Sequence, residues 1–289
     1  MSLSSVLEKL ATFRNSNARE SQEVFKNAEL ILNSVKSLGD DGWTVLEQLF
    51  LAAMDMGRLD IADKCLQQLS DQFRDSPRVE VLTGIRMEAS EPAETVLQYY
   101  TQLLDADEAN MAAWKRKISV LRRLGRLEQA VTELSELLDI FYNDVDGWLE
   151  LTDIYTSCHQ YSNSLQSLSQ ALLLAPQNPF YVLQYAETAY TAGDIPLALK
   201  YFLVAVDMLE RELDSPEAFP PSGIAVRAWL GVKLCARHLM DNSSPSASST
   251  AVPKTLNLIE ELATERVLAA YPSEKSGTRS IMVNWVAGQ

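Results

Sequence analysis

The sequence is poor in the residues from which most catalytic and metal sites are built. It contains two histidines and three cysteines, and Cys65, Cys158 and Cys235 lie far apart without forming a CxxC pair. It has no glycine-rich phosphate loop and no GxSxG or HExxH motif. Cys158 and His159 are adjacent, but neighbours on a helix point in different directions, and no second cluster supplies partners. We therefore expect no enzymatic activity, metal or cofactor, and we interpret the cysteines as small core residues in a reducing compartment.

Long apolar runs and basic residues are also scarce. The best apolar candidates, ALLLA from Ala171 and YFLVAV from Tyr201, are far shorter than the ~20 residues that span a bilayer. The N-terminal MSLSSVLEKLATFRNS has acidic and polar residues where a signal peptide needs an uninterrupted apolar stretch. With 39 acidic against 25 basic residues, the net charge of -14 opposes general binding to a phosphate backbone. We expect a cytosolic protein with no transmembrane span and no nucleic-acid partner.

What the sequence does contain is a helical repeat. Residues 145–178 fit the tetratricopeptide template, a helical hairpin that recurs every 34 residues. The apolar and small positions of that template are occupied by Trp148, Leu151, Tyr155, Ser164, Leu168 and Ala171, and Pro176 ends the unit. Two antiparallel helices cannot bury both apolar stripes alone, so such hairpins stack into an array.

Steps of 34 residues in both directions find the same pattern again. The turn between the two helices of each hairpin falls at Gly57, Glu91, Gly125, His159 and Gly193, without an insertion or deletion. The predicted fold is therefore all-α, a tetratricopeptide-repeat solenoid of helical hairpins wound into a right-handed superhelix. His159 is interpreted as a tolerated surface residue, not as a ligand.

The pattern divides the chain into four regions. We expect capping helices in 1–42, written as two helices over 4 to about 38, and five repeats in 43–212. Residues 213–271 form an interrupted sixth repeat, with a proline-rich stretch at its start and a serine-rich loop within it, which caps the array. Residues 272–289 are a tail without a strong pattern, although Trp285 is placed to dock back.

First-helix positions that normally face the groove of such an array are the candidate binding residues. They are Lys115, Ser119, Arg122, Leu149, Asp153, Leu183, Glu187 and Tyr190. The basic run that begins at Lys115 has two readings that remain open: a solvated helix face that complements the helix dipole, or a groove that binds a ligand. Along the three repeats the groove changes from basic to mixed apolar and acidic, which suits a protein segment.

The same first-helix positions also test another function, the binding of chaperone tails. Tetratricopeptide co-chaperones hold the acidic tail of cytosolic chaperones with lysine, asparagine and arginine from successive repeats, and Lys115 matches the first of these. Ser119 and Glu150 replace the two asparagines, and Phe180 and Gln184 replace the later lysine and arginine. Because a glutamate facing a carboxylate repels it, we reject that clamp.

Beyond the generic repeat, two segments carry a family resemblance. KRKISVLRRLGRLEQAVTELSELLDIFYNDVDGWLELTDIY from Lys115 and QNPFYVLQYAETAYTAGD from Gln177 resemble the family of subunit 2 of the endoplasmic reticulum (ER) membrane protein complex, also called tetratricopeptide repeat protein 35. The resemblance runs from about Trp43 to Tyr271. This chain departs from the family by its proline-rich stretch near Pro220 and its serine-rich loop near Pro245.

The resemblance implies a function. Members of this family are non-catalytic scaffold subunits at the cytoplasmic face of the ER membrane, attached through membrane-embedded and soluble partner subunits in a hetero-oligomer. Their complex inserts tail-anchored and multipass proteins into the membrane. The alternative from the residues alone is a free tetratricopeptide adaptor or co-chaperone that binds peptide segments in the cytosol. A third reading, an enzyme subunit, requires a partner that carries the active site.

Overall fold

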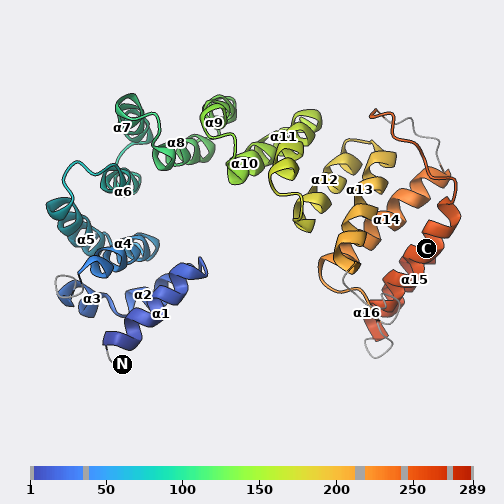
Figure 1. Cartoon of the computed structure of the whole chain (residues 1–289), viewed down its shortest axis with the longest axis horizontal. Helices are drawn as coiled ribbons and strands as arrows, with labels where there is room; N and C mark the ends of the chain where they lie inside the picture. The colour runs from blue at the N-terminus through green and yellow to red at the C-terminus, as the bar shows by residue number, and fades with distance from the viewer. Residues whose placement is uncertain (1–2, 35–38, 212–218, 242–246, 272–275, 288–289) are drawn as a thin grey trace. The chain divides into compact units, whose positions relative to one another are not determined.

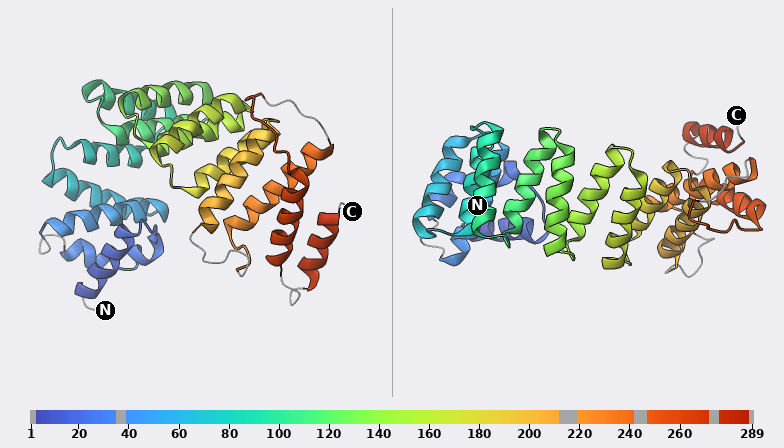
Figure 2. Two further views of the ribbon diagram at one scale, coloured as in Figure 1. Left: turned by 45° about the vertical axis from the view of Figure 1, so that its right-hand side comes forward. Right: turned by 90° about the horizontal axis from the view of Figure 1, so that it is seen from above.

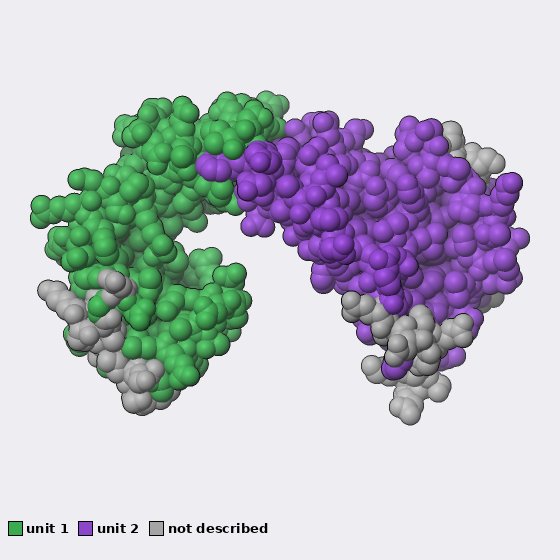
Figure 3. Space-filling view, in the orientation of Figure 1, with its two compact units in different colours: residues 1–140 green, residues 141–289 purple. Residues whose placement is uncertain are grey.

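The computed structural model describes residues 3–34, 39–211, 219–241, 247–271 and 276–287. The chain divides into two compact units, Met1–Ile140 and Phe141–Gln289 (Figure 3). Within the described ranges every regular element is an α-helix (Figure 1), which confirms the predicted all-α class. None of these helices is long and apolar enough to cross a membrane.

The first unit contains nine helices in its described residues. They are α1 (Leu3–Asn15), α2 (Ser21–Phe25), α3 (Ala28–Ser34), α4 (Asp40–Asp55), α5 (Leu59–Gln72), α6 (Pro77–Met87), α7 (Ala93–Ala106), α8 (Met111–Arg123) and α9 (Leu127–Ile140). From α4 onward they form the hairpins α4–α5, α6–α7 and α8–α9, whose helices alternate in direction (Figure 2).

The second unit contains seven helices in its described residues. They are α10 (Val145–Ser157), α11 (Tyr161–Leu174), α12 (Pro179–Thr191), α13 (Ile195–Glu210), α14 (Ile224–Asp241), α15 (Leu256–Ala269) and α16 (Ser276–Ala287). Helices α10 to α15 form three further hairpins, and each packs on the next.

The predicted turn column holds at four of its five positions. Gly57, Gly125, His159 and Gly193 all have positive φ, between 58° and 86°. In each case the following backbone N–H donates to a carbonyl five residues earlier, as Gln160 does to Tyr155 at 2.8 Å. This pairing closes the C-terminal end of the first helix and reverses the chain. His159 therefore occupies a left-handed position that glycine fills elsewhere.

Glu91 is the exception, and the structure corrects the prediction there. Its φ is not positive, and its N–H donates to the Met87 carbonyl at 2.8 Å. The reason is Pro92, because the residue before a proline is driven towards extended backbone conformations. The connection between α6 and α7 begins at Glu88, the residue after the end of α6, and the side chain of Glu88 is almost buried.

The N-terminal region forms three helices where the sequence predicted two. The long second helix is broken at Asn27, whose side-chain amide donates to the Glu23 carbonyl at 3.0 Å. Such side-chain bonds compete with the backbone ladder of a helix. Val35, which the sequence placed on the apolar stripe of that helix, lies outside the described residues.

The end of the chain is more ordered than its pattern suggested. Helix α16 forms within the predicted tail, and Met282 and Val286 pack against the core of the second unit. Arg237 donates to the Trp285 carbonyl at 3.1 Å, so the region around Trp285 docks back on α14. Parts of the predicted proline-rich stretch and of the serine-rich loop lie outside the described residues. The described part of that loop returns to the hairpins, since the Ser248 N–H donates to buried Asp194 at 2.8 Å.

Four aromatic residues at large apolar positions of the repeat differ in burial. Trp114 and Phe202 are buried, whereas Trp148 and Tyr155 are only partly covered. The two indole N–H groups make equivalent hydrogen bonds. Trp114 donates to the Glu108 carbonyl at 3.0 Å, and Trp148 donates to the Tyr142 carbonyl at 2.9 Å. The tryptophans therefore also tie each first helix to the turn that precedes it.

A close approach between helices gives the first testable prediction. A Cβ added to Gly84 of α6 would lie 2.5 Å from Cε1 of Tyr100 in α7, a fully buried ring. We expect Gly84→Ala to lower the free energy of unfolding by about 1–3 kcal/mol, because the ring has no room to move. Gly277→Ala is the control, since a Cβ there meets nothing within 4 Å. Equal urea midpoints for the two variants would contradict the packing described.

The cysteines give a second prediction, on chemical reactivity. Burial raises the pKa of Cys65 and of Cys235 to about 12, whereas Cys158 is exposed. Because the thiolate is the reactive form, iodoacetamide at pH 8 should modify Cys158 alone in the folded protein. Mass spectrometry of tryptic peptides measures this. All three should react in urea, and early labelling of Cys65 without urea would show that its core opens.

Candidate functional site

The predicted groove residues come from the first helices of three hairpins and fall in both units. Lys115, Ser119 and Arg122 lie on α8 in the first unit, and Leu149 and Asp153 lie on α10 in the second. Leu183, Glu187 and Tyr190 lie on α12. Three of the five candidates in the second unit lie close together, because Asp153, Leu183 and Glu187 line one pocket.

This pocket of the second unit has an apolar floor and a polar rim. Leu183 forms the floor with only 2% of its surface exposed, so it belongs to the core as much as to the groove. Phe180 stands beside it with 60% of its surface exposed. The rim is polar, and its side chains come from α10, α12 and α14. The rim residues are Asp153, Thr156, Gln184, Glu187, Thr188, Thr191 and Arg227.

The charges of the rim are partly matched. Arg227 of α14 donates through Nη2 to Oε2 of Glu187 at 2.7 Å, with a second bond from Nε to the same carboxylate. Two threonines of α12 bond back to their own helix, Thr188 to the Gln184 carbonyl at 2.8 Å and Thr191 to the Glu187 carbonyl at 2.9 Å. Their hydroxyl oxygens still have capacity to accept a bond from a ligand.

Among the pocket residues that were not selected as groove candidates, Phe180 and Arg227 stand out. Phe180 was considered only as a departure from the chaperone clamp, and its high exposure is the signal that now marks it. Arg227 follows the proline-rich stretch, where the 34-residue register is lost, so no column pointed to it. Leu149 and Tyr190 do not line the pocket; both are partly buried, and Tyr190 packs against the core.

The basic run of α8 is paired largely within the first unit. Arg116 bonds Glu88 with an Nη2–Oε1 distance of 2.7 Å, and Lys117 bonds Glu133 of α9 at 2.7 Å. Arg126 pairs with Glu94 of α7, and Lys115 and Arg122 also have interactions. The positive charges thus connect neighbouring helices, and this favours the structural reading of the run.

Glu88 is the centre of that network. Its side chain is only 6% exposed, and besides Arg116 it pairs with Arg123 at 3.5 Å. The Tyr100 hydroxyl donates to its Oε1 at 2.8 Å. Burial, together with the negative charge of Glu88, raises the pKa of Tyr100. One buried carboxylate therefore joins α6, α7 and α8.

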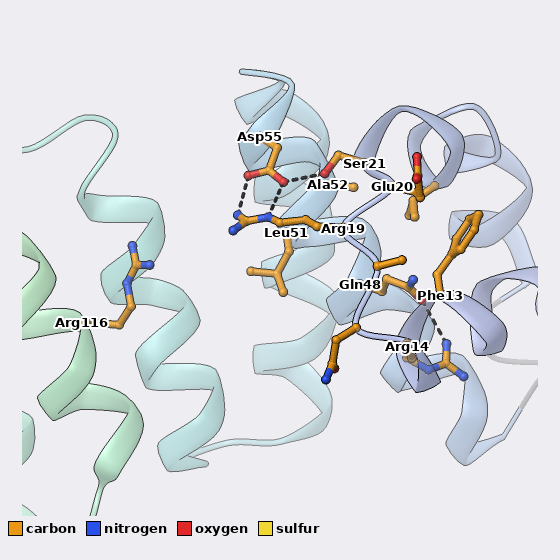
Figure 4. Close-up of a pocket in the computed structure, with 13 residues that line it drawn as sticks. Phe13, Arg14, Arg19, Glu20, Ser21, Gln48, Leu51, Ala52, Asp55 and Arg116 are labelled. Carbon is orange, nitrogen blue, oxygen red and sulfur yellow. Dashed lines mark hydrogen bonds and ion pairs between the residues drawn. The ribbon is translucent and has the colours of Figure 1, made fainter. Parts of the chain in front are cut away.

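A second pocket lies in the first unit, beside the N-terminal helices (Figure 4). Arg19 bonds Asp55 of α4 through two nitrogen atoms at 2.6 and 2.7 Å, and Arg14 donates to Gln48 at 3.0 Å. Burial raises the pKa of Asp55, but the bonds from Arg19 and Ser21 outweigh it and lower the pKa overall. Arg116 of α8 also lines this pocket, apart from the other two arginines in the view. The N-terminal region lies outside the repeat register, so no repeat position indicated Arg14 or Arg19.

A metal site requires several histidine, cysteine or carboxylate side chains that converge on one point. Across the described ranges, no group of three or more His, Cys, Asp or Glu side chains is arranged to hold a metal ion. The Nδ1 atom of His159 contacts the Tyr161 hydroxyl at 3.0 Å, on the exposed surface.

Comparison with known proteins adds a specific family. The family model described as "EMC2 TPR-like repeat domain" matches residues 75–212. The ER membrane protein complex subunit 2-A of Xenopus laevis is 37% identical over 244 residues, which cover 83% of this chain and 78% of the relative. The TPR repeat protein oca3 of Schizosaccharomyces pombe is 29% identical over 242 residues, 82% of this chain and 78% of the relative. The solved C-terminal part of a TPR repeat-containing protein from Cytophaga hutchinsonii shares the fold, with a TM-score of 0.59 at 13% identity, covering 89% of this chain and 96% of that one.

The contribution of Glu88 to stability can be measured by substitution. Glu88→Gln removes the charge that two arginines share in a nearly buried position, so we expect the free energy of unfolding to fall by about 2–3 kcal/mol. Glu94→Gln breaks an exposed pair with Arg126 and should cost less than about 0.5 kcal/mol. Urea denaturation of both variants measures the difference. A loss for Glu88→Gln no larger than for Glu94→Gln would show that the network contributes little.

Proposed function

Because this chain belongs to the family of ER membrane protein complex subunit 2, we propose that it is a non-catalytic scaffold subunit of that complex. In this role it supports the insertion of tail-anchored and multipass proteins into the ER membrane. It makes no catalytic contribution of its own, and it holds other subunits in position.

The pocket of the second unit is the observation that carries the proposal. It combines one exposed aromatic ring, a buried leucine floor and a rim of hydroxyl, amide and charged groups, on three different helices. An apolar anchor surrounded by polar groups is the composition of a surface that binds a protein segment. A small polar metabolite would not cover the apolar ring of Phe180, whereas a protein segment can.

The location and partners follow from the same family. We place the chain at the cytoplasmic face of the ER membrane, held there by membrane-embedded and soluble partner subunits in a hetero-oligomer. In each unit by itself, the groove candidates that are not core residues are proposed as contacts for cytosolic segments of those subunits. They are Lys115, Ser119 and Arg122 in the first unit, and Leu149, Asp153 and Glu187 in the second. Residues 1–42 cap the array of five repeats in 43–212, and residues 213–271 close its other end with the interrupted sixth repeat.

Charge and shape variants of the groove test the proposal. We expect Phe180→Asp, and separately Lys115→Glu with Arg122→Glu, to reduce recovery of partner subunits when the tagged chain is purified in mild detergent from its own cells. Losing the aromatic anchor of an interface costs about 2 kcal/mol or more, which corresponds to association that is weaker by about thirty-fold or more. Quantitative mass spectrometry of the co-purified proteins gives the measurement.

The matched control is Lys64→Glu with Arg74→Glu, which makes the same change in net charge at two exposed residues of α5 and the turn after it. Circular dichroism of each purified variant checks that the helices remain. Full recovery of ER membrane subunits with both groove variants would refute the groove contacts. Recovery of cytosolic chaperones alone with the unaltered chain would instead support the free adaptor function.

A further inference from the structure

Helix α15 is apolar on two opposite sides. On one side Ala263 and Val267 are fully buried in the core of the second unit. On the other side Leu258 and Leu262 are 63% and 48% exposed, one helical turn apart. A helix with an apolar stripe on both sides needs a neighbour on each. Helices α14 and α16 both contact α15, yet Leu258 and Leu262 stay exposed.

The second helices of the chain differ on this point: α11 also exposes Leu173 and Leu174 at its end, whereas α9 presents polar residues on its outer side. Helix α9 also has 14 residues, but its outward positions Thr132, Glu136 and Asp139 are polar and exposed. Helix α15 belongs to the last hairpin, where a repeat array normally carries a polar outer face. Its two leucines depart from that rule, and the contacts that α15 makes with α16 leave both of them exposed.

Two carboxylates lie beside the exposed leucines. Glu261 and Glu265 are exposed, one turn apart on the same side of α15, and neither forms an ion pair with a described residue. Glu260 differs, because it turns inward and pairs with buried Lys233. The outer face is thus a short apolar ridge flanked by negative charge.

This chemistry selects the kind of partner. A second copy of the chain would bring the same carboxylates opposite each other, and like charges in an interface cost several kcal/mol. A membrane surface with anionic lipids is also repelled by them. A helix with an apolar stripe and flanking lysine or arginine satisfies both the ridge and the charges.

We infer that the outer face of α15, formed by Leu258, Glu261, Leu262 and Glu265, is the docking surface for a basic amphipathic helix of a partner protein. The partner's apolar side chains pack around Leu258 and Leu262, and its cations pair with Glu261 and Glu265. This surface is separate from the groove, so loss of binding in the groove variants leaves it intact.

Site-specific crosslinking in the assembled protein tests the inference. The photoreactive residue p-benzoylphenylalanine replaces Leu262 in the tagged full chain, which is irradiated in its own cells, and the attached peptide is sequenced by mass spectrometry. We expect one partner segment with apolar residues at helical spacing and adjacent lysine or arginine. Glu261→Lys with Glu265→Lys should lower the yield of that product at least about five-fold.

The control variant, Glu136→Lys with Asp139→Lys, changes the net charge equally on α9 and should leave the yield unchanged. Glu261→Gln with Glu265→Gln should give an intermediate yield, which separates attraction from newly introduced repulsion. The inference is overturned by a product joined to a second copy, to lipid or to a segment without basic residues. It is equally overturned by no product above that obtained from position 132, or by a yield that the charge reversal does not change.

Discussion

At two places in the chain, close packing of a helix against its neighbour depends on a glycine that faces an aromatic ring. Gly84 leaves the space that the Tyr100 ring occupies, and Gly231 leaves the space that Phe202 occupies. Each ring is nearly or fully buried, so helices approach closely and exclude water. Other features depend on that approach. With α6 and α7 at this distance, the Tyr100 hydroxyl reaches Glu88, and Glu88 in turn holds two arginines of the α8 region. A local steric fit thereby positions a buried charge.

The turns add a second constraint, which is independent of packing. A residue in the left-handed region ends each first helix at Gly57, Gly125, His159 and Gly193, and the same hydrogen bond follows it each time. Because the bond is local, each turn forms without help from the next hairpin. His159 shows that the column requires a backbone conformation and not a particular residue, although a side chain at φ 58° adds strain that glycine avoids.

The 34-residue period was sufficient to predict the helices, the hairpins and most turns, because these depend on short-range pattern. It was insufficient wherever a neighbour outside the register decides the outcome. Pro92 removes the turn at Glu91, and Asn27 divides a helix that looked continuous. In the site, the equivalent positions of successive repeats predicted that Asp153, Leu183 and Glu187 share a surface. These positions do not indicate how deeply a side chain is buried, and Leu183 is a core residue. Arg227 arrives from a helix beyond the proline-rich stretch, where there is no column to follow.

Charge is distributed in two different ways in this acidic chain. Basic residues of α8 and the turn after it face carboxylates of α6, α7 and α9, so a run that looks like a binding surface in sequence is largely used inside the first unit. Lys233 and Arg266 in the second unit are likewise buried against Glu260 and Glu210. When cations are engaged in this way, acidic residues are left over at the surface, in keeping with the net charge of -14. Scattered carboxylates keep a surface soluble, but carboxylates beside the exposed leucines of α15 do not remove the cost of leaving those leucines in water. Their placement together on α15 has a physical purpose only if another molecule covers them both.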